Sequence, residues 1–146
     1  MGACEIERFK VIDFTYTRMS FEPDISEKDG HVVQYYLQYN EIEYRDYQVD
    51  LAEKALEESS LLVLPTGTGK TVITMLVSGE RYRKHNADGK ILFLAPQKPL
   101  VAQQKEFYEE VMDINSEKFT VLTGDTRPAK REQLWPEYDF IFATPQ

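Results

Sequence analysis

Residues 65–71 read PTGTGKT and bring together the residue types that hold a polyphosphate. The two glycines can adopt positive φ and leave backbone N–H groups uncovered, so several N–H groups can converge on one oxyanion. A lysine here can reach the β- and γ-phosphates of a nucleotide, and a threonine hydroxyl can ligate Mg²⁺. The stretch therefore predicts an ATP cradle made of Pro65, Thr66, Gly67, Thr68, Gly69, Lys70 and Thr71.

The strict pattern G-x-x-x-x-G-K-[ST] is not met, because Leu64 stands where its first glycine is required. Leu64 ends the apolar run LLVL, which we interpret as a short buried strand, and a helical pattern follows over residues 70–86. Strand, glycine-rich loop, Gly-Lys-Thr and helix thus occur in order. We expect Lys70 and Thr71 to act in catalysis and Thr71 to hold Mg²⁺; a glycine-rich turn without a ligand is the alternative.

Short apolar strands alternate with helices around this loop. Strands are predicted over residues 61–64, 91–95, 119–123 and 139–143, and helices over residues 45–60, 70–86, 99–112 and 127–135. The alternation predicts an α/β fold with a parallel sheet covered by helices on both faces. The loops after the strands should open at one edge of the sheet, where ligands bind in open parallel sheets.

The first 41 residues differ in character and are predicted to be an acidic extension with a small antiparallel β add-on. Period-two alternation over 9–17 and 31–39 predicts two strands, and Pro23 and Gly30 place a loop over 18–30. Residues 1–60 hold 14 Asp or Glu against 6 Lys or Arg, whereas residues 61–146 hold 11 of each. The overall charge of −8 argues weakly against nucleic-acid binding, but the neutral second part leaves room for local phosphate contacts.

Composition narrows the class of protein further. A chain of 146 residues has the size of one domain, and its single cysteine, Cys4, excludes an internal disulfide. No apolar run approaches the ~18 residues of a transmembrane helix, so no membrane partner is expected. Cys4, His31 and His85 are too scattered for a metal site. These features are typical of a cytoplasmic protein.

Five stretches, in order, resemble the motifs of the first RecA-like domain of superfamily 2 helicases. The chain is most similar to the Hef/FANCM branch of archaeal and eukaryotic DNA translocases, over about residues 42–146. The matching stretches are YRDYQ (44–48, the Q motif), PTGTGKT (65–71, motif I), LAPQKPLVAQQ (94–104, motif Ia), TGD (123–125, motif Ib) and ATPQ (143–146). The resemblance implies a P-loop, RecA-like parallel sheet, here incomplete, and the use of ATP and Mg²⁺.

The same resemblance implies roles for residues outside the phosphate loop. The Gln48 amide can donate to and accept from adenine, and Arg45 could stack on the base or reach a phosphate. From the residues alone, an exposed helix face is an equal alternative for both. Contacts to a nucleic-acid backbone are implied for Pro96, Gln97, Lys98, Pro99, Thr123, Gly124, Thr144 and Pro145, although the family commonly has threonine where Gln97 stands.

Two further groups of side chains have open interpretations. Arg127, Lys130 and Arg131 form a small basic group that could steer a phosphate backbone or face solvent. The tyrosines of the first part could stack on bases, but packing within a small sheet is favoured; they are Tyr35, Tyr36, Tyr39 and Tyr44.

The family's second catalytic motif is an apolar strand ending in Asp-Glu, and no apolar run of this sequence ends so. We therefore expect residues 1–146 alone not to turn over ATP, and we expect a second RecA-like domain as partner. The predicted function is the ATP-binding part of an ATP-dependent DNA helicase or translocase that acts on forked or branched, partly single-stranded DNA in repair. The alternatives are a restriction-system motor subunit, an RNA-sensing duplex-RNA ATPase and a nucleotide-binding module without a nucleic-acid role.

Overall fold

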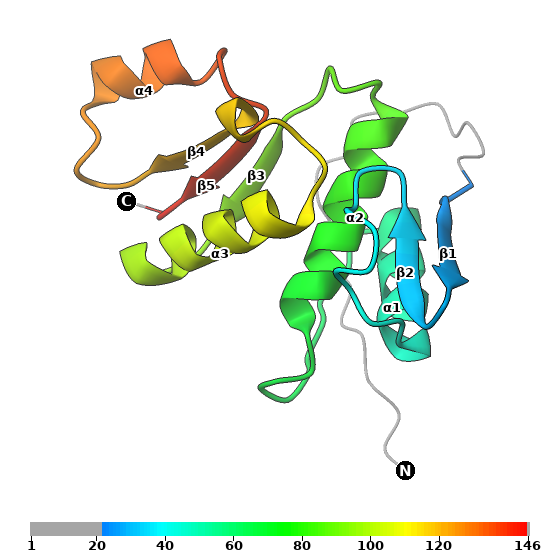
Figure 1. Cartoon of the computed structure of the whole chain (residues 1–146). Coiled ribbons are helices and arrows are strands. Elements are labelled where there is room, and N and C mark those ends of the chain that lie inside the picture. Colours follow the sequence, from blue (N-terminus) through cyan, green and yellow to red (C-terminus); the bar gives the residue numbers. More distant parts are fainter. Residues whose placement is uncertain (1–21, 146) are drawn as a thin grey trace.

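The computed structural model describes residues 22–145, which form a β-hairpin followed by an α/β unit (Figure 1). The elements are β1 (Ile25–Lys28), β2 (His31–Gln34), α1 (Asp46–Glu57), α2 (Lys70–Lys84), β3 (Ile91–Leu94), α3 (Lys98–Val111), the 3-10 helix η1 (Ser116–Lys118), β4 (Phe119–Leu122), α4 (Pro128–Leu134) and β5 (Phe140–Ala143). Within residues 22–145, none of the helices combines the length and the apolarity that crossing a bilayer requires.

The main sheet is parallel and has the strand order β3-β5-β4. The register pairs both Leu94 and Leu122 with Ala143, so the three strands end level with one another. The loops that follow these strands therefore leave the sheet at a single edge, its carboxyl edge. The predicted parallel α/β architecture is confirmed.

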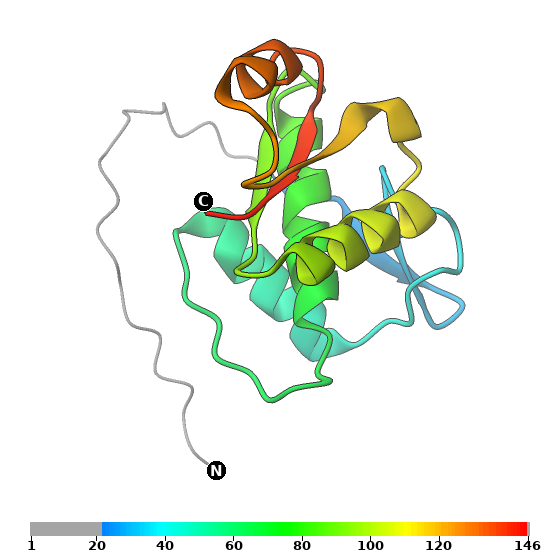
Figure 2. The same cartoon turned by 90° about the vertical axis from the view of Figure 1, so that its left-hand side faces the viewer.

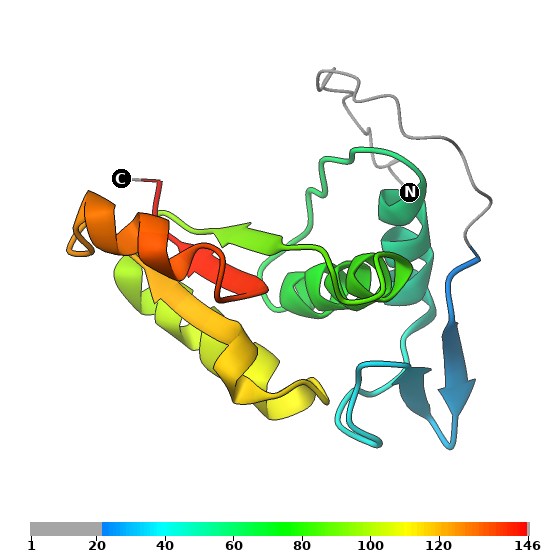
Figure 3. The same cartoon turned by 90° about the horizontal axis from the view of Figure 1, so that it is seen from above.

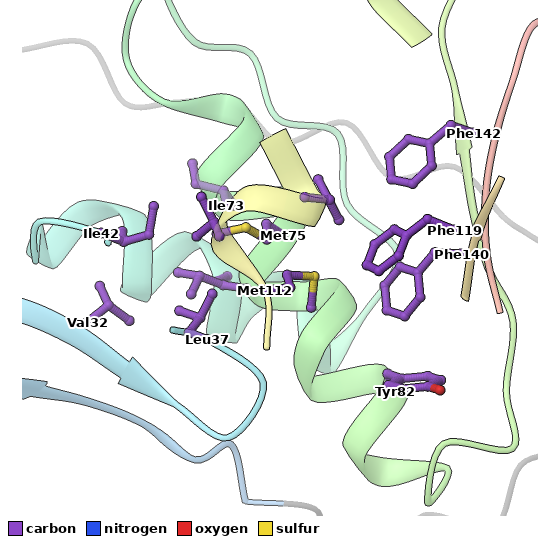
Figure 4. Packing of buried hydrophobic residues seen from close by; sticks show 14 of the residues in the cluster. Val32, Leu37, Ile42, Ile73, Met75, Tyr82, Met112, Phe119, Phe140 and Phe142 are labelled. Carbon is purple, nitrogen blue, oxygen red and sulfur yellow. The ribbon is translucent and has the colours of Figure 1, made fainter. Parts of the chain in front are cut away.

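Aromatic side chains fill the space between this sheet and the helices. Phe140 and Phe142 of the central strand are fully buried, and the Phe140 ring stacks on Phe119 with 4.9 Å between ring centroids (Figure 4). Tyr108 of α3 meets Phe142 edge-on at 5.1 Å. Burial of each such side chain contributes roughly 1.5–3 kcal/mol. This packing fixes α3 against the central strand and so fixes where α3 begins.

The opposite face of the sheet is covered only in part. Ile141 and Ala143 pack there with Leu122, against Leu134 of α4 and Tyr138. Leu92 and Leu94 of β3 remain 49% and 56% exposed. Helices on both faces were predicted, and within the described residues this holds for β4 and β5 more than for β3.

Residues 58–69 form an extended connection from the end of α1 to the start of α2 (Figure 2). We predicted a buried strand at 61–64, but Leu61 and Val63 are 42% and 64% exposed. Leu62 and Leu64 pack against the core, so the segment keeps the alternation of a strand. A strand also requires a hydrogen-bonded neighbour, and the described residues supply no neighbouring strand to this segment.

The hairpin lies across the α1–α2 pair from the main sheet (Figures 1 and 3). β1 and β2 pair from Ile25–Gln34 to Lys28–His31, and Asp29 and Gly30 turn the chain with φ of 52° and 79°. The prediction of a loop over 18–30 is wrong at β1, because Asp-Gly is itself a strong signal for a tight hairpin turn. Of the predicted strand at 31–39, only residues 31–34 are a strand; the one predicted at 9–17 lies outside the described residues.

The hairpin is anchored on α2 by a buried glutamine. Gln34 Nε2 donates to the Leu76 carbonyl at 2.7 Å, and a Cβ at Gly79 would lie 2.6 Å from Gln34 Oε1. A side chain at position 79 would therefore displace the Gln34 amide that anchors β2 on the helix.

The tyrosines near the hairpin divide into two groups. Tyr36 and Tyr44 pack against the core, as predicted. Tyr35 and Tyr39 are 68% and 52% exposed and pack at the surface, Tyr35 edge-on to the Tyr36 ring at 4.8 Å and Tyr39 with the Lys28 ammonium 5.3 Å from its ring centroid.

Candidate nucleotide and nucleic-acid sites

The phosphate loop has the backbone that its glycines predict. Gly67 and Gly69 have φ of 82° and 77°, in the left-handed region where glycine is favoured. Gly69 is also the N-cap of α2, and the first turn of this helix carries no acidic residue. A helix N-terminus bears partial positive charge and unpaired N–H groups, so this end of α2 suits an anion.

The two residues predicted to act on the phosphates lie at the start of α2. Lys70 is exposed, and its ammonium donates to the Leu64 carbonyl at 2.7 Å and to the Pro65 carbonyl at 3.0 Å. Thr71 is half-buried and, with Lys70, lines a cavity of about 170 Å³ that also reaches Ala95 and Leu100. This cavity places the phosphate loop beside the carboxyl end of β3 and the start of α3.

Helix α1 holds the loop from the other side. Tyr47 donates its hydroxyl to the Thr68 carbonyl at 2.6 Å, and Gln48 Nε2 donates to the same carbonyl at 3.1 Å. A Cβ at Gly69 would lie only 2.2 Å from Gln48 Nε2. Gln48 is 3% exposed, so the interpretation of Gln48 as part of an exposed helix face is wrong.

A second cavity, of about 210 Å³, brings the predicted adenine residues to the loop. Arg45 and Gln48 line it together with Gly67 and Gly69. Arg45 is exposed and forms an ion pair with Glu43, with 2.9 Å between Nη2 and Oε2. Hydrogen bonding to the Tyr47 hydroxyl and to the Glu43 carboxylate raises the pKa of the Arg45 guanidinium, which stays charged. A base in this cavity would lie between a cation and an amide.

The residues predicted to touch a nucleic-acid backbone lie around the carboxyl edge. Gln97 is the N-cap of α3 and Lys98 its first residue. The exposed members of the predicted set are Pro96, Gln97, Lys98, Pro99, Gly124 and Pro145, while Thr123 is half-buried. Lys98 forms an ion pair with Asp125 across the edge, 2.5 Å between Nζ and Oδ2, which joins the loops after β3 and β4.

Thr144 differs from the other members of this set. It is 7% exposed, and its hydroxyl is buried without a hydrogen-bond partner among the described residues. Its backbone N–H donates to the Leu122 carbonyl at 3.1 Å. The structure thus places Thr144 at the predicted edge but turns its hydroxyl inward.

Two residues at these sites have roles that the sequence did not reveal. Arg131 donates to the carbonyls of Thr126 at 2.8 Å and Thr123 at 3.2 Å, so it fixes the loop after β4 instead of facing solvent. Tyr47 is 39% exposed and bonds to the phosphate loop. A helix start at Pro128 places Arg131 one turn into the helix and so could have signalled its contact with the loop after β4. No local pattern signals the contact of Tyr47 with the phosphate loop.

The fold and the loop together define an α/β P-loop domain of the RecA-like type. Residues 41–146 match the family described as "Type III restriction enzyme, res subunit", and the chain belongs to this family. The crystal structure of the Pyrococcus furiosus Hef helicase domain is similar, with a TM-score of 0.69 and 40% identity, over 76% of this chain and 23% of that one. The resemblance to the Hef/FANCM branch is confirmed.

Two curated relatives carry the same comparison to eukaryotes. The chain is 42% identical over 107 residues to the DEAD-box ATP-dependent DNA helicase Fancm of Drosophila melanogaster. This match covers 73% of this chain and 7% of the relative. It is 43% identical over 102 residues to the DEAD-box ATP-dependent RNA helicase FANCM of Arabidopsis thaliana, over 70% of this chain and 8% of the relative. The chain thus spans less than a tenth of either relative.

Proposed function

We propose that this chain is the ATP-binding part of an ATP-dependent helicase or translocase. The observation that carries the proposal is the shared cavity in which Arg45 and Gln48 meet Gly67 and Gly69. A phosphate loop alone suits many nucleotide enzymes, whereas an amide and a guanidinium beside the loop add selection of the base. The helicase relatives support the assignment of this arrangement to a motor.

The residues present fit ATP with Mg²⁺. The positive-φ glycines and the N-terminus of α2 form a cradle for phosphates, and Lys70 is held on two carbonyls that it can leave for a phosphate oxygen. Thr71 is the residue that would ligate Mg²⁺, and Gln48 and Arg45 would hold the adenine. Bound ATP supplies the free energy of γ-phosphate transfer to water, which in a motor is converted into movement.

We propose that the loops at the carboxyl edge contact a nucleic-acid strand through its phosphates. Lys98 and the N-terminus of α3 offer positive charge there, and contacts to the backbone do not depend on sequence, as movement along a strand requires. We favour DNA, forked or branched, as the substrate. We further propose that a second RecA-like domain of the same protein closes over the bound ATP. The proposed location is the cytoplasm.

The test is ATP hydrolysis by the full-length protein with and without forked DNA. Lys70→Ala should lower hydrolysis at least about 100-fold, because an ammonium that stabilises the transferring phosphate is lost. Lys98→Ala should weaken DNA binding and leave basal hydrolysis unchanged, while Lys105→Ala, on the same helix but paired with Glu109, should change neither. Unchanged DNA binding in Lys98→Ala would favour a nucleotide-binding module without a nucleic-acid role.

Two other motors remain as second candidates because of what the family and one relative are called. The family description names a restriction-enzyme subunit, and the Arabidopsis relative is named an RNA helicase. Competition between forked DNA and duplex RNA for the full-length protein separates the DNA translocase from an RNA-sensing ATPase. DNA cleavage that depends on ATP would instead favour the restriction motor.

A further inference from the structure

We propose that Tyr47 is a positioning residue that couples the base-reading amide of Gln48 to the phosphate loop. This inference rests on the proposed function and assigns a determinant of ATP selection within it. Tyr47 does not line the cavity that holds Arg45 and Gln48; it lines a separate groove between α1 and residues 62–64. Its hydroxyl bonds to Gln48, to the loop and to Arg45, so it acts on the nucleotide site through these groups.

Three groups converge at the start of α1. The Tyr47 hydroxyl donates to the Thr68 carbonyl at 2.6 Å, and Gln48 Nε2 lies 3.1 Å from that carbonyl and 3.3 Å from the Tyr47 oxygen. The carbonyl has two lone pairs and accepts both bonds. The two donors belong to adjacent helical residues, whose side chains diverge by about 100°. The loop presents a backbone carbonyl to which both side chains bond.

The loop presents that carbonyl because of its two glycines. Gly67 and Gly69 flank Thr68, and both have φ in the left-handed region. This conformation turns the Thr68 carbonyl toward α1. A carbonyl held on the α1 side leaves the loop N–H groups for an anion, as a phosphate cradle needs. The Tyr47–Thr68 bond therefore stabilises the loop in the form that binds phosphate.

The Tyr47 hydroxyl and the Thr68 carbonyl also fix the orientation of the Gln48 amide, because both accept from its Nε2. With its Nε2 directed at Thr68 and Tyr47, the Gln48 amide keeps its oxygen to accept from the N6 amino group of adenine, and guanine presents a carbonyl where adenine has that amino group. An amide rotated by 180° would present its donor to this guanine carbonyl. Two oxygens near Nε2, those of Thr68 and Tyr47, oppose this rotation because the amide oxygen would then face two lone-pair-bearing groups. Loss of the Tyr47 hydroxyl removes one of them.

The test is Tyr47→Phe in the full-length protein, with the dissociation constants of ATP, GTP and inorganic pyrophosphate measured by calorimetry. The phenyl ring keeps the packing and removes the hydroxyl, with its hydrogen bonds to the Thr68 carbonyl, the Gln48 amide and the Arg45 guanidinium. ATP affinity should fall about three- to tenfold, and the preference for ATP over GTP should shrink at least about threefold. Tyr39→Phe is the matched control, since its hydroxyl bonds to Asp29 on the hairpin at 2.9 Å, and it should change none of these constants.

Each other outcome overturns the inference. Equal losses of ATP, GTP and pyrophosphate would show a role in the stability of the loop alone, and unchanged constants would show that the hydroxyl has no role. Failure of the proposed function has a different signature, in which the wild-type protein itself does not prefer ATP. Gln48→Ala provides the remaining check: in that background, Tyr47→Phe should no longer alter the ratio of ATP to GTP affinity.

Discussion

The two edges of the parallel sheet use their polar residues in opposite ways. At the amino edge, Asp139 accepts from the Tyr82 hydroxyl at 2.7 Å and pairs with Lys118 at 3.0 Å. Lys90 there donates to the Tyr138 carbonyl at 2.7 Å. At the carboxyl edge, Lys70 is exposed and bonds only to loop carbonyls among the partners the structure shows.

This difference separates stability from binding. The amino edge joins the end of α2, η1 and β5 through the Asp139 carboxylate, which is 14% exposed and accepts from the buried Tyr82, although its partner Lys118 is 48% exposed. The carboxyl edge keeps its donors in contacts that a ligand can replace, because parallel sheets bind ligands at that edge. Changes to polar side chains at the carboxyl edge should therefore alter binding with little loss of stability, and changes to polar side chains at the amino edge should do the reverse.

The largest effect that tests this separation is expected from Gly69→Ala. The new methyl group would lie 2.2 Å from Gln48 Nε2, and an alanine would be strained at the φ of 77° that Gly69 adopts. Both the loop and the base-reading amide must therefore shift. ATP affinity should fall more than about tenfold, with a loss of about 1–2 kcal/mol in unfolding free energy from the backbone strain.

Gly30→Ala supplies the control for this strain. Gly30 has φ of 79° and open space around its Cβ position, and it lies in the hairpin turn. The variant should lose a similar free energy of unfolding and keep its ATP affinity. If both variants lost ATP affinity equally, binding would depend on general stability and the separation of the two edges would fail.

How much of this arrangement the sequence could predict depends on the range of the contacts. Order and type of the elements follow from local periodicity, and the phosphate loop follows from seven consecutive residues. The role of Gln48 beside the phosphate loop was predicted through the family resemblance. From the residues alone, an exposed helix face was an equal alternative for Gln48. The strand predicted at 61–64 failed because a strand needs a neighbour, and periodicity describes only one strand.

Contacts across many residues were beyond local patterns. The Tyr47–Thr68 bond spans 21 positions and joins a side chain to a backbone carbonyl, so no residue type in the loop signals it. Thr144 was placed correctly at the carboxyl edge, but the inward turn of its hydroxyl depends on the packing around the central strand β5. The orientation of a side chain at a strand end follows from tertiary structure, not from the strand pattern.

A smaller effect, on stability alone, is expected from Asp139→Asn at the amino edge. Burial acts to raise the pKa of the Asp139 carboxyl, but the hydrogen bonds from Tyr82 and Lys118 outweigh it and hold this pKa below its usual value. Loss of the charge should lower the free energy of unfolding by about 1 kcal/mol at pH 7 and leave ATP affinity unchanged. Urea denaturation measures the first quantity and calorimetry the second.

The pH dependence gives this prediction a sign. A carboxyl whose pKa is lowered by folding contributes stability above its unfolded pKa of about 3.9 and loses it as the pH falls through the folded value. Wild type and Asp139→Asn should therefore converge in stability as the pH falls below about 4, whereas Asp88→Asn, in the exposed turn after α2, should follow wild type throughout. A constant difference at all pH values would contradict the role of the charge.

The smallest effect is expected from Asp125→Asn, at the one charged pair that the carboxyl edge forms across its loops within the described residues. Lys98 and Asp125 have side chains 52% and 77% exposed, and such pairs contribute about 0.2–1 kcal/mol. A phosphate must displace Asp125 from Lys98, so the variant should bind forked DNA up to about fivefold more tightly at low salt, and the gain should vanish as salt screens both contacts. Asp113→Asn removes the same charge beyond the far end of α3 and should gain far less. Equal gains in the two variants would mean that net charge, and not competition for Lys98, controls binding at this edge.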